Sequence, residues 1–248
     1  MIEQSVNISM PDGLAEGTLF IPDAQQRYPG VLYFVDIAGV RPANLSMANR
    51  LAEQGYAVLA PNLFYRTSKI PVFDFPLKFG EERTAKRLGE LSAPLTPDAM
   101  ERDASAYVDF LAASDGVGTG PMGVVGFCFS GSMAMRAAAA RPDRIAAIAS
   151  FHGGRLFTDQ ATSPHLQLPR VKARLYFGHA VEDKSMPAES ISKFEDALRA
   201  WGGRYQSETY EGALHGWTVP GGHAYNHPQA ERAFEKLTQL FAETLKQV

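Results

Sequence analysis

Three residues that lie far apart in the chain carry side chains that could together perform nucleophilic catalysis: Cys128, Asp183 and His215. A thiol attacks well only as a thiolate, so it needs a base that takes its proton. A histidine can be that base, and a carboxylate fixes the tautomer of the imidazole and stabilises the imidazolium. These three residue types predict covalent catalysis at sulfur.

Cys128, the only cysteine, lies between an apolar stretch at 122–125 and a run of small residues at 130–140. We interpret these as a strand and a helix joined by the nucleophile turn G-x-S-x-G, with sulfur in place of oxygen. Gly126 flanks the thiol, and Ser130 takes the place of the second glycine. Such a tight turn requires small neighbours. The alternative is a buried free cysteine, which packs as a small apolar side chain.

Asp183 and His215 each follow a predicted buried strand, at 173–177 and 205–210. Functional groups of open α/β sheets collect in loops beyond the carboxyl ends of the strands. Asp183 lies 55 residues after the cysteine and 32 before His215, which leaves room for one or two strand–helix units in each interval. Asp183 could instead cap a helix, and His215 could be a surface residue. Their coincidence in the order nucleophile, acid, base favours catalysis.

The elements that must position these residues alternate along the chain. Strands are predicted at 6–10, 14–21, 30–35, 56–60, 122–125, 145–151, 173–177 and 205–210, the first two as an antiparallel hairpin. Helices are predicted at 42–54, 98–113, 130–140, 188–201 and 227–247, the second capped by Asp98 or Thr96. This alternation predicts an α/β fold, a mostly parallel sheet with helices on both faces. We expect one domain over 1–248, with 62–97 as an irregular excursion over the sheet edge.

Composition limits the possible partners. The chain has 248 residues, 45% of them apolar and 21% charged, as expected of a globular protein with one sizeable core. A net charge of −3 gives no basic field for nucleic acid or a membrane. One cysteine forms no internal disulfide, and the first ten residues lack the pattern of a signal peptide. We therefore expect a cytoplasmic enzyme whose partner is a small-molecule substrate.

Two other patterns could indicate a dinucleotide or a metal site, but their context argues against both. The glycines at 116, 118 and 120 precede a strand, whereas a dinucleotide-binding loop follows one. His223 and His227 are four residues apart and could face one metal ion, but 226–228 (Asn-His-Pro) indicates a helix start and no H-E-x-x-H motif is present. We expect neither a metal nor another cofactor.

The sequence resembles the dienelactone hydrolase family, the cysteine branch of the α/β-hydrolases, over nearly its whole length. The matching segments are 35–40 (VDIAGV), 55–64 (GYAVLAPNLF), 126–128 (GFC) and 210–215 (YEGALH). The resemblance implies the α/β-hydrolase fold, a Cys128–His215–Asp183 triad and hydrolysis of an ester or lactone through an acyl group on sulfur. It also implies an oxyanion hole formed by the backbone N–H groups of Ile37 and Phe129.

Two departures from the family concern the surroundings of the thiol. Asp36 stands where the family has a glutamate that interacts with the thiol, and it is one methylene shorter. Val219 stands where the family has one of two arginines that hold a substrate carboxylate, and valine cannot replace that contact. Arg83 is then the first candidate for the other cation, before Arg87 and Lys86.

Aromatic side chains near the predicted strand ends are candidates for contact with substrate, with ordinary core packing as the alternative. They are Tyr65, Phe127, Phe151, His152 and Trp217. The function expected is hydrolysis of small esters or lactones. The alternatives are a ligand-binding or sensor protein on the same fold, or a promiscuous esterase or phosphotriesterase.

Overall fold

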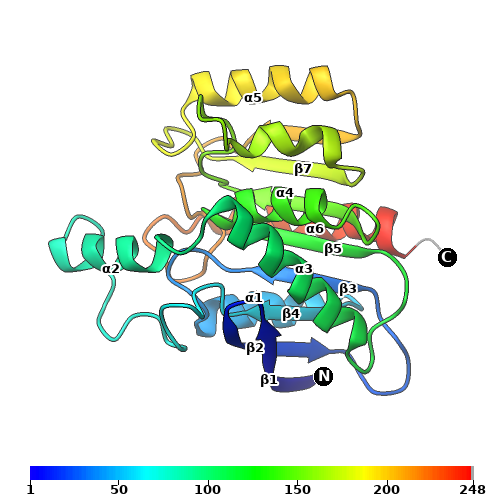
Figure 1. Ribbon diagram of the computed structural model, residues 1–248. Coiled ribbons are helices and arrows are strands. Elements are labelled where there is room, and N and C mark those ends of the chain that lie inside the picture. Colours follow the sequence, from blue (N-terminus) through cyan, green and yellow to red (C-terminus); the bar gives the residue numbers. More distant parts are fainter. Residues whose placement is uncertain (247–248) are drawn as a thin grey trace.

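One eight-stranded sheet organises the computed structural model, which describes residues 1–246 (Figure 1). The strands are β1 (Ile2–Met10), β2 (Gly13–Ile21), β3 (Gly30–Phe34), β4 (Ala57–Pro61), β5 (Met122–Phe127), β6 (Ile145–Phe151), β7 (Arg174–His179) and β8 (Tyr205–Thr209). Their order in the sheet is β1-β2-β4-β3-β5-β6-β7-β8. The pairs β1–β2 and β2–β4 are antiparallel, and every pair from β4 to β8 is parallel. The predicted hairpin and mostly parallel sheet are confirmed.

Helices cover both faces of this sheet. They are α1 (Pro42–Ala52), α2 (Glu82–Ser92), α3 (Pro97–Ala113), α4 (Ser130–Ala140), the 3₁₀ helix η1 (Pro164–Arg170), α5 (Ala188–Trp201) and α6 (His227–Leu245). Figure 1 shows α3 and α4 in front of the sheet and α1 and α6 behind it. A sheet covered on both sides needs apolar side chains on both faces of its central strands. Accordingly, every residue of β3, β4 and β5 is buried.

The structure selects one of the two caps predicted for α3, and it describes the last predicted helix only in part. Thr96, not Asp98, caps α3, because its side chain accepts a hydrogen bond from the backbone N–H of Ala99. The helix predicted to end at Gln247 is described as far as Leu245, and its last predicted residue lies outside the described residues.

The segment at 62–97 is less irregular than predicted. It contains α2, which extends from one side of the molecule (Figure 1). This helix was not predicted because five of its eleven residues are charged and only Thr84 and Leu91 are buried. Its few apolar residues do have helical spacing, but they lie within a segment taken as irregular because of its charges. The preceding stretch, 71–79, lies against the strand-end loops described next and not only along the sheet edge.

The parallel strands β3, β5, β6, β7 and β8 bring their carboxyl-end loops to the same side of the sheet. These loops contain, in chain order, Asp36, Cys128, His152, Asp183 and His215. None of the helices within residues 1–246 has the length and apolar character needed to cross a bilayer.

Candidate active site

Cys128 occupies a strained turn between β5 and α4. Its φ angle is +60°, in the left-handed region that residues with a side chain rarely adopt. The turn closes only because Gly126 and Gly131, on either side of it, lack side chains. A Cβ on Gly126 would lie 2.3 Å from the backbone oxygen of Ser130, and one on Gly131 would lie 2.2 Å from Ser150 Oγ. The predicted strand–turn–helix geometry at the thiol is therefore present.

Ser130, the residue that departs from the glycine pattern, has a structural role in this turn. It is fully buried, and its hydroxyl accepts a hydrogen bond from the backbone N–H of Phe127 at 2.9 Å. The hydroxyl oxygen also lies 2.9 Å from the carbonyl oxygens of Phe34 and Phe127, to either of which it can donate. Ser130 thereby ties the turn to β3 instead of merely being tolerated.

His215 and Asp183 form a close pair. His215 Nδ1 lies 2.6 Å from Asp183 Oδ2, and the other carboxylate oxygen accepts hydrogen bonds from the backbone N–H and the hydroxyl of Ser185 at 2.8 and 2.7 Å. Asp183 does not cap α5, whose N-cap is Pro187. Burial alone would raise the pKa of Asp183, but these hydrogen bonds outweigh it and lower the pKa.

The surroundings of His215 favour its protonated form, the imidazolium. Burial opposes the charge, but the Asp183 carboxylate and the Cys128 sulfur outweigh it and raise the pKa of His215 to about 10. Cys128 and His215 line the same two pockets, of about 610 and 500 Å³. The thiol and the imidazole are therefore neighbours at a surface that a ligand can reach from two sides.

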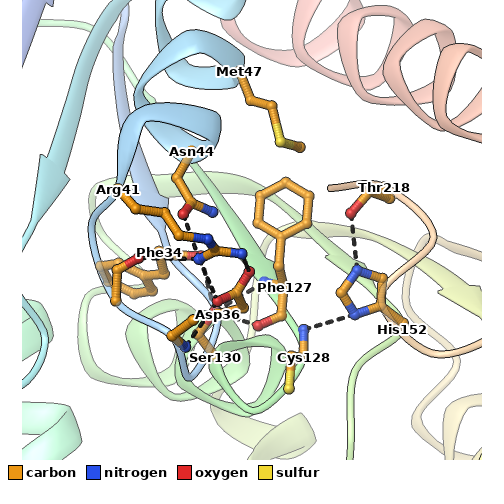
Figure 2. Close-up of polar contacts among 12 residues, drawn as sticks. Phe34, Asp36, Arg41, Asn44, Met47, Phe127, Cys128, Ser130, His152 and Thr218 are labelled. Atoms are coloured by element: carbon orange, nitrogen blue, oxygen red, sulfur yellow. Dashed lines mark hydrogen bonds and ion pairs between the residues drawn. The ribbon is translucent and has the colours of Figure 1, made fainter. Parts of the chain in front are cut away.

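The loop after β3 is held by an ion pair that the sequence did not reveal. Arg41 makes two hydrogen bonds to Asp36, at 2.7 and 2.8 Å, and a third to Asn44 Oδ1 at 2.6 Å (Figure 2). Asp36 also accepts a hydrogen bond from the backbone N–H of Ala38 at 2.9 Å. The aspartate is thus occupied in shaping the loop that carries Ile37.

Two backbone N–H groups are free to bind a ligand oxygen. Neither the amide of Ile37 nor that of Phe129 donates a hydrogen bond to any atom of residues 1–246. Phe129 follows the thiol, and Ile37 lies in the loop after β3 and lines the 610 Å³ pocket with Cys128.

His152 connects the cysteine turn to the histidine loop. The backbone N–H of Cys128 donates to His152 Nδ1 at 3.1 Å, and His152 Nε2 lies 2.9 Å from Thr218 Oγ1 (Figure 2). The ring centroids of His152 and His215 are 5.0 Å apart. Burial and the neighbouring imidazolium lower the pKa of His152 well below its usual value, so it stays neutral.

The other aromatic candidates lie behind or beside the pocket surface. Trp217 is fully buried, with its ring centroid 5.1 Å from that of His152. Phe127 is buried under the cysteine turn, and Phe151 packs against it. The hydroxyl of Tyr65 donates to Asp103. None of these four lines the 610 Å³ pocket; their contacts are those of core packing.

The candidate cations are not brought to the thiol. Arg83 and Lys86 line a separate pocket with Arg87, and the Arg83 guanidinium lies 3.8 Å from the centroid of the Phe75 ring, on which it stacks. Val219 lines the 610 Å³ pocket, as the sequence comparison with the family implied. The arginines that share a pocket with the thiol are ones that the sequence did not suggest, Arg41 in the larger pocket and Arg136 and Arg155 in the smaller one.

Comparison with known proteins identifies the class. The model of the dienelactone hydrolase family matches residues 15–245. A carboxymethylenebutenolidase of Rhodococcus opacus is 27% identical over 83% of this chain and 76% of its own length, and the hydrolase tropI of Talaromyces stipitatus is 28% identical over 86% and 80%. A crystal structure from Klebsiella pneumoniae superposes with a TM-score of 0.86 at 20% identity, covering 98% of both chains.

A dienelactone hydrolase-like promiscuous phosphotriesterase from metagenomic libraries superposes with a TM-score of 0.80 at 21% identity, again over 98% of both chains. Fold and family therefore agree. The chain belongs to the dienelactone hydrolase family, has the α/β-hydrolase fold and is a hydrolase that resembles dienelactone hydrolase.

Proposed function

We propose that this protein hydrolyses small esters or lactones through a covalent acyl group on Cys128. The observation that carries the proposal is the His215–Asp183 pair beside a thiol on a strained strand–turn–helix junction. A base with a carboxylate partner next to a nucleophile is the arrangement that activates thiols and hydroxyls in unrelated hydrolases.

Acylation begins with the proton of Cys128 on His215, since the raised pKa of the imidazole favours an imidazolium beside a thiolate. The sulfur attacks the carbonyl carbon of the substrate, and the carbonyl oxygen takes up the electron pair. The free N–H groups of Ile37 and Phe129 bind that oxyanion. When the C–O bond breaks, the imidazolium gives its proton to the departing oxygen, which leaves a thioester and an alcohol.

Deacylation reverses these roles. The neutral imidazole of His215 accepts a proton from water, and the resulting hydroxide attacks the thioester carbon. The same two N–H groups bind the oxyanion. The carbon–sulfur bond then breaks with its electron pair staying on sulfur, which releases the carboxylic acid and leaves the thiolate beside the His215 imidazolium that holds the proton from water, as at the start. Asp183 stays ionised throughout and holds Nδ1 of His215, so that Nε2 faces the reacting groups.

Turnover of p-nitrophenyl acetate by matched variants tests the proposal. We expect Cys128→Ala to lose essentially all turnover above the background rate, because no nucleophile remains. Cys128→Ser should keep weak activity, since the oxyanion-binding amides survive while the oxygen nucleophile is poorly matched to this base. Wild-type turnover by Cys128→Ala would contradict the proposal.

The same assay separates a catalyst from a sensor with a reactive thiol. A catalyst releases many equivalents of p-nitrophenol per protein molecule. A sensor releases one at most, because its thiol is modified and not regenerated.

A further inference from the structure

One wall of the larger pocket has a sequence pattern that the triad does not explain. From 73 to 79 the chain reads F-D-F-P-L-K-F, and its alternate residues Phe73, Phe75, Leu77 and Phe79 all line the 610 Å³ pocket that contains Cys128. The residues between them, at 74, 76 and 78, are exposed. An extended segment places alternate side chains on opposite sides. Four apolar side chains therefore face the pocket from one strip of backbone.

This apolar wall, residues 73–79, is anchored to the loop that carries Ile37. Val72 is 2% exposed, and its Cγ2 lies 2.5 Å from where a Cβ on Gly39 would stand, so it fills the space that this glycine leaves. Arg87 donates a hydrogen bond to the carbonyl oxygen of Val72 at 3.0 Å, and Arg83 stacks on the outer side of Phe75. The position of the wall relative to the oxyanion-binding loop is thereby fixed.

The charged groups that line the pocket are already paired, and the imidazolium of His215 is paired with the Asp183 carboxylate. Within residues 1–246, the acidic and basic side chains that line it, histidines aside, are Asp36 and Arg41, and these two are paired with each other. A substrate carboxylate there would lose its water without gaining a free cation, which is costly. An apolar substituent would instead gain from burial against the aromatic wall.

We infer that the apolar wall selects neutral esters that carry an apolar group of about six carbons or an aromatic ring. This inference rests on the proposed function and names its substrate class. A pocket of 610 Å³ is of the size that holds such a molecule. The substrate class differs from that of a small carboxylated lactone, whose recognition needs a free cation.

Two series of neutral esters test the inference: p-nitrophenyl esters from acetate to hexanoate, and acetate esters from methyl to hexyl and phenyl. We expect kcat/KM to rise by roughly two- to fourfold per methylene in at least one series, as burial of CH₂ groups predicts. Carboxylated analogues of equal length should be poorer by roughly tenfold or more. A flat or falling profile in both series, or better turnover of the carboxylated analogues, overturns the inference.

Variants of the apolar wall supply the control. In the series that shows the rise, Phe75→Ala should lower the ratio of kcat/KM between the longest and the shortest ester by roughly three- to tenfold. Lys78→Ala, on the exposed side of the same strip, should leave that ratio unchanged. Equal ratios in the wild type and Phe75→Ala would contradict the inference even if Lys78→Ala behaves as expected. Failure of the proposed function is distinguishable, because then acetate esters would not be turned over at all.

A second inference concerns His152, which links the loops of the nucleophile and the base. Its φ angle is +41°, it is 1% exposed, and its ring lies between the cysteine turn and the loop that carries Thr218 and His215. The backbone N–H of Cys128 can only donate, so Nδ1 of His152 must accept and the proton must lie on Nε2. That proton is then donated to Thr218 Oγ1. The tautomer of His152 is thereby fixed.

We propose that His152 is a positioning residue that sets the thiol of Cys128 relative to His215 through these two hydrogen bonds. It does not touch the reacting atoms in this account. Its contribution is to hold the cysteine turn, whose backbone N–H is shared between His152 Nδ1 and the carbonyl oxygen of Phe151 at 3.2 Å.

Paired variants at both ends of this chain of hydrogen bonds test the proposal. Valine has nearly the same shape as threonine, so Thr218→Val removes only the hydroxyl that accepts from His152, whereas Thr218→Ser keeps that hydroxyl. We expect Thr218→Val to lower kcat by roughly tenfold with KM nearly unchanged, the size expected for loss of one buried hydrogen bond, and Thr218→Ser to stay close to the wild type. Equal kinetics of the two variants, or a loss confined to KM, overturns the proposal.

A substitution at position 152 gives an independent readout. Asn tolerates the left-handed conformation and offers an oxygen to the N–H of Cys128, whereas Leu offers none. We expect kcat to fall in the order wild type, His152→Asn, His152→Leu. If His152→Asn and His152→Leu are equally active at equal melting temperatures, the hydrogen bond to the cysteine turn has no positioning role.

Discussion

The loops at the carboxyl ends of the strands and the apolar wall at 73–79 meet in one pocket but are built differently. Ser130, His152 and Asp183 are at most 6% exposed, and each is held by at least two hydrogen bonds. Along the wall, by contrast, Phe79 is 64% exposed, and Phe75 is in edge-to-face contact with Phe73 and lies under the guanidinium of Arg83. Changes in the loops should therefore alter the rate for every substrate, and changes in the wall should alter the choice among substrates.

The largest expected effect is at Asp183. Asp183→Asn removes the charge that holds and stabilises the His215 imidazolium, and we expect kcat/KM to fall by roughly a thousandfold for short and long esters alike. Ser185→Ala is the matched control, because it removes only one hydrogen bond to the carboxylate and should cost roughly tenfold or less. A loss that depends on acyl length would contradict the division between loops and wall.

The next largest effect is expected in the pH dependence of kcat/KM, which follows the protonation of His215. Because its pKa is raised to about 10, the imidazolium persists at neutral pH and is lost as the pH rises through about 10. We expect kcat/KM for an alkyl ester, followed in a pH-stat, to fall on that alkaline side. A fall centred near 6.5, the ordinary value for histidine, would show that the pair with Asp183 and Cys128 does not stabilise the charge.

The same shift predicts how stability varies with pH. A group whose pKa is raised on folding contributes stability that is fully present below its unfolded pKa and is lost as the pH rises through its folded pKa. For His215 that interval runs from about 6.5 to about 10. The difference in free energy of unfolding between the wild type and Asp183→Asn, measured by urea denaturation, should therefore shrink across this interval. A difference that grows with pH would oppose the assignment.

The ion pair between Asp36 and Arg41 faces the pocket, but it holds one of the strand-end loops, so its loss should affect all substrates alike. Arg41→Met leaves a largely buried carboxylate without its partner, so we expect roughly a tenfold loss of kcat on all esters as the loop of Ile37 shifts. The double variant Asp36→Asn with Arg41→Met should recover part of that loss. If the single variant changes the hexanoate-to-acetate ratio instead, Arg41 acts on substrate directly.

The smallest effect is expected at Arg83. The sequence suggested that this residue binds a substrate carboxylate. In that case Arg83→Ala would lower kcat/KM selectively for carboxylated lactones. The structure stacks it on the outer side of Phe75, so we expect less than roughly a threefold change on such lactones and a similarly slight loss on long neutral esters. A selective tenfold loss on carboxylated lactones would restore the sequence-based hypothesis and contradict the neutral-substrate inference.

The sequence was most informative where burial is complete. Strands covered on both faces are continuous apolar runs, so β3, β4 and β6 could be read directly, and the order of Cys128, Asp183 and His215 followed from their positions after strands. Helix α2 was missed although its apolar residues have helical spacing, because five of its eleven residues are charged and only two are buried.

Contacts through the backbone were the least predictable part of the site. His152 was singled out as an aromatic neighbour of the substrate, but nothing in the sequence shows that its ring accepts from the N–H of Cys128. The pair of Asp36 and Arg41 had a weak signal, since Arg41 comes five residues later and directly before Pro42 at the start of α1. The alternation at 73–79 was a readable signal that was missed within a segment taken as irregular.

Mass spectrometry of the protein, quenched in acid during turnover of a p-nitrophenyl ester, tests whether Cys128 carries the acyl group. We expect the peptide containing Cys128 to gain the mass of the acyl group. The adduct should disappear once substrate is exhausted, and it should be absent in Cys128→Ala. The variant His215→Ala should slow hydrolysis of the acyl group and so make the adduct easier to detect. Ester turnover with no adduct on that peptide, in both the wild type and His215→Ala, would contradict a cysteinyl acyl intermediate.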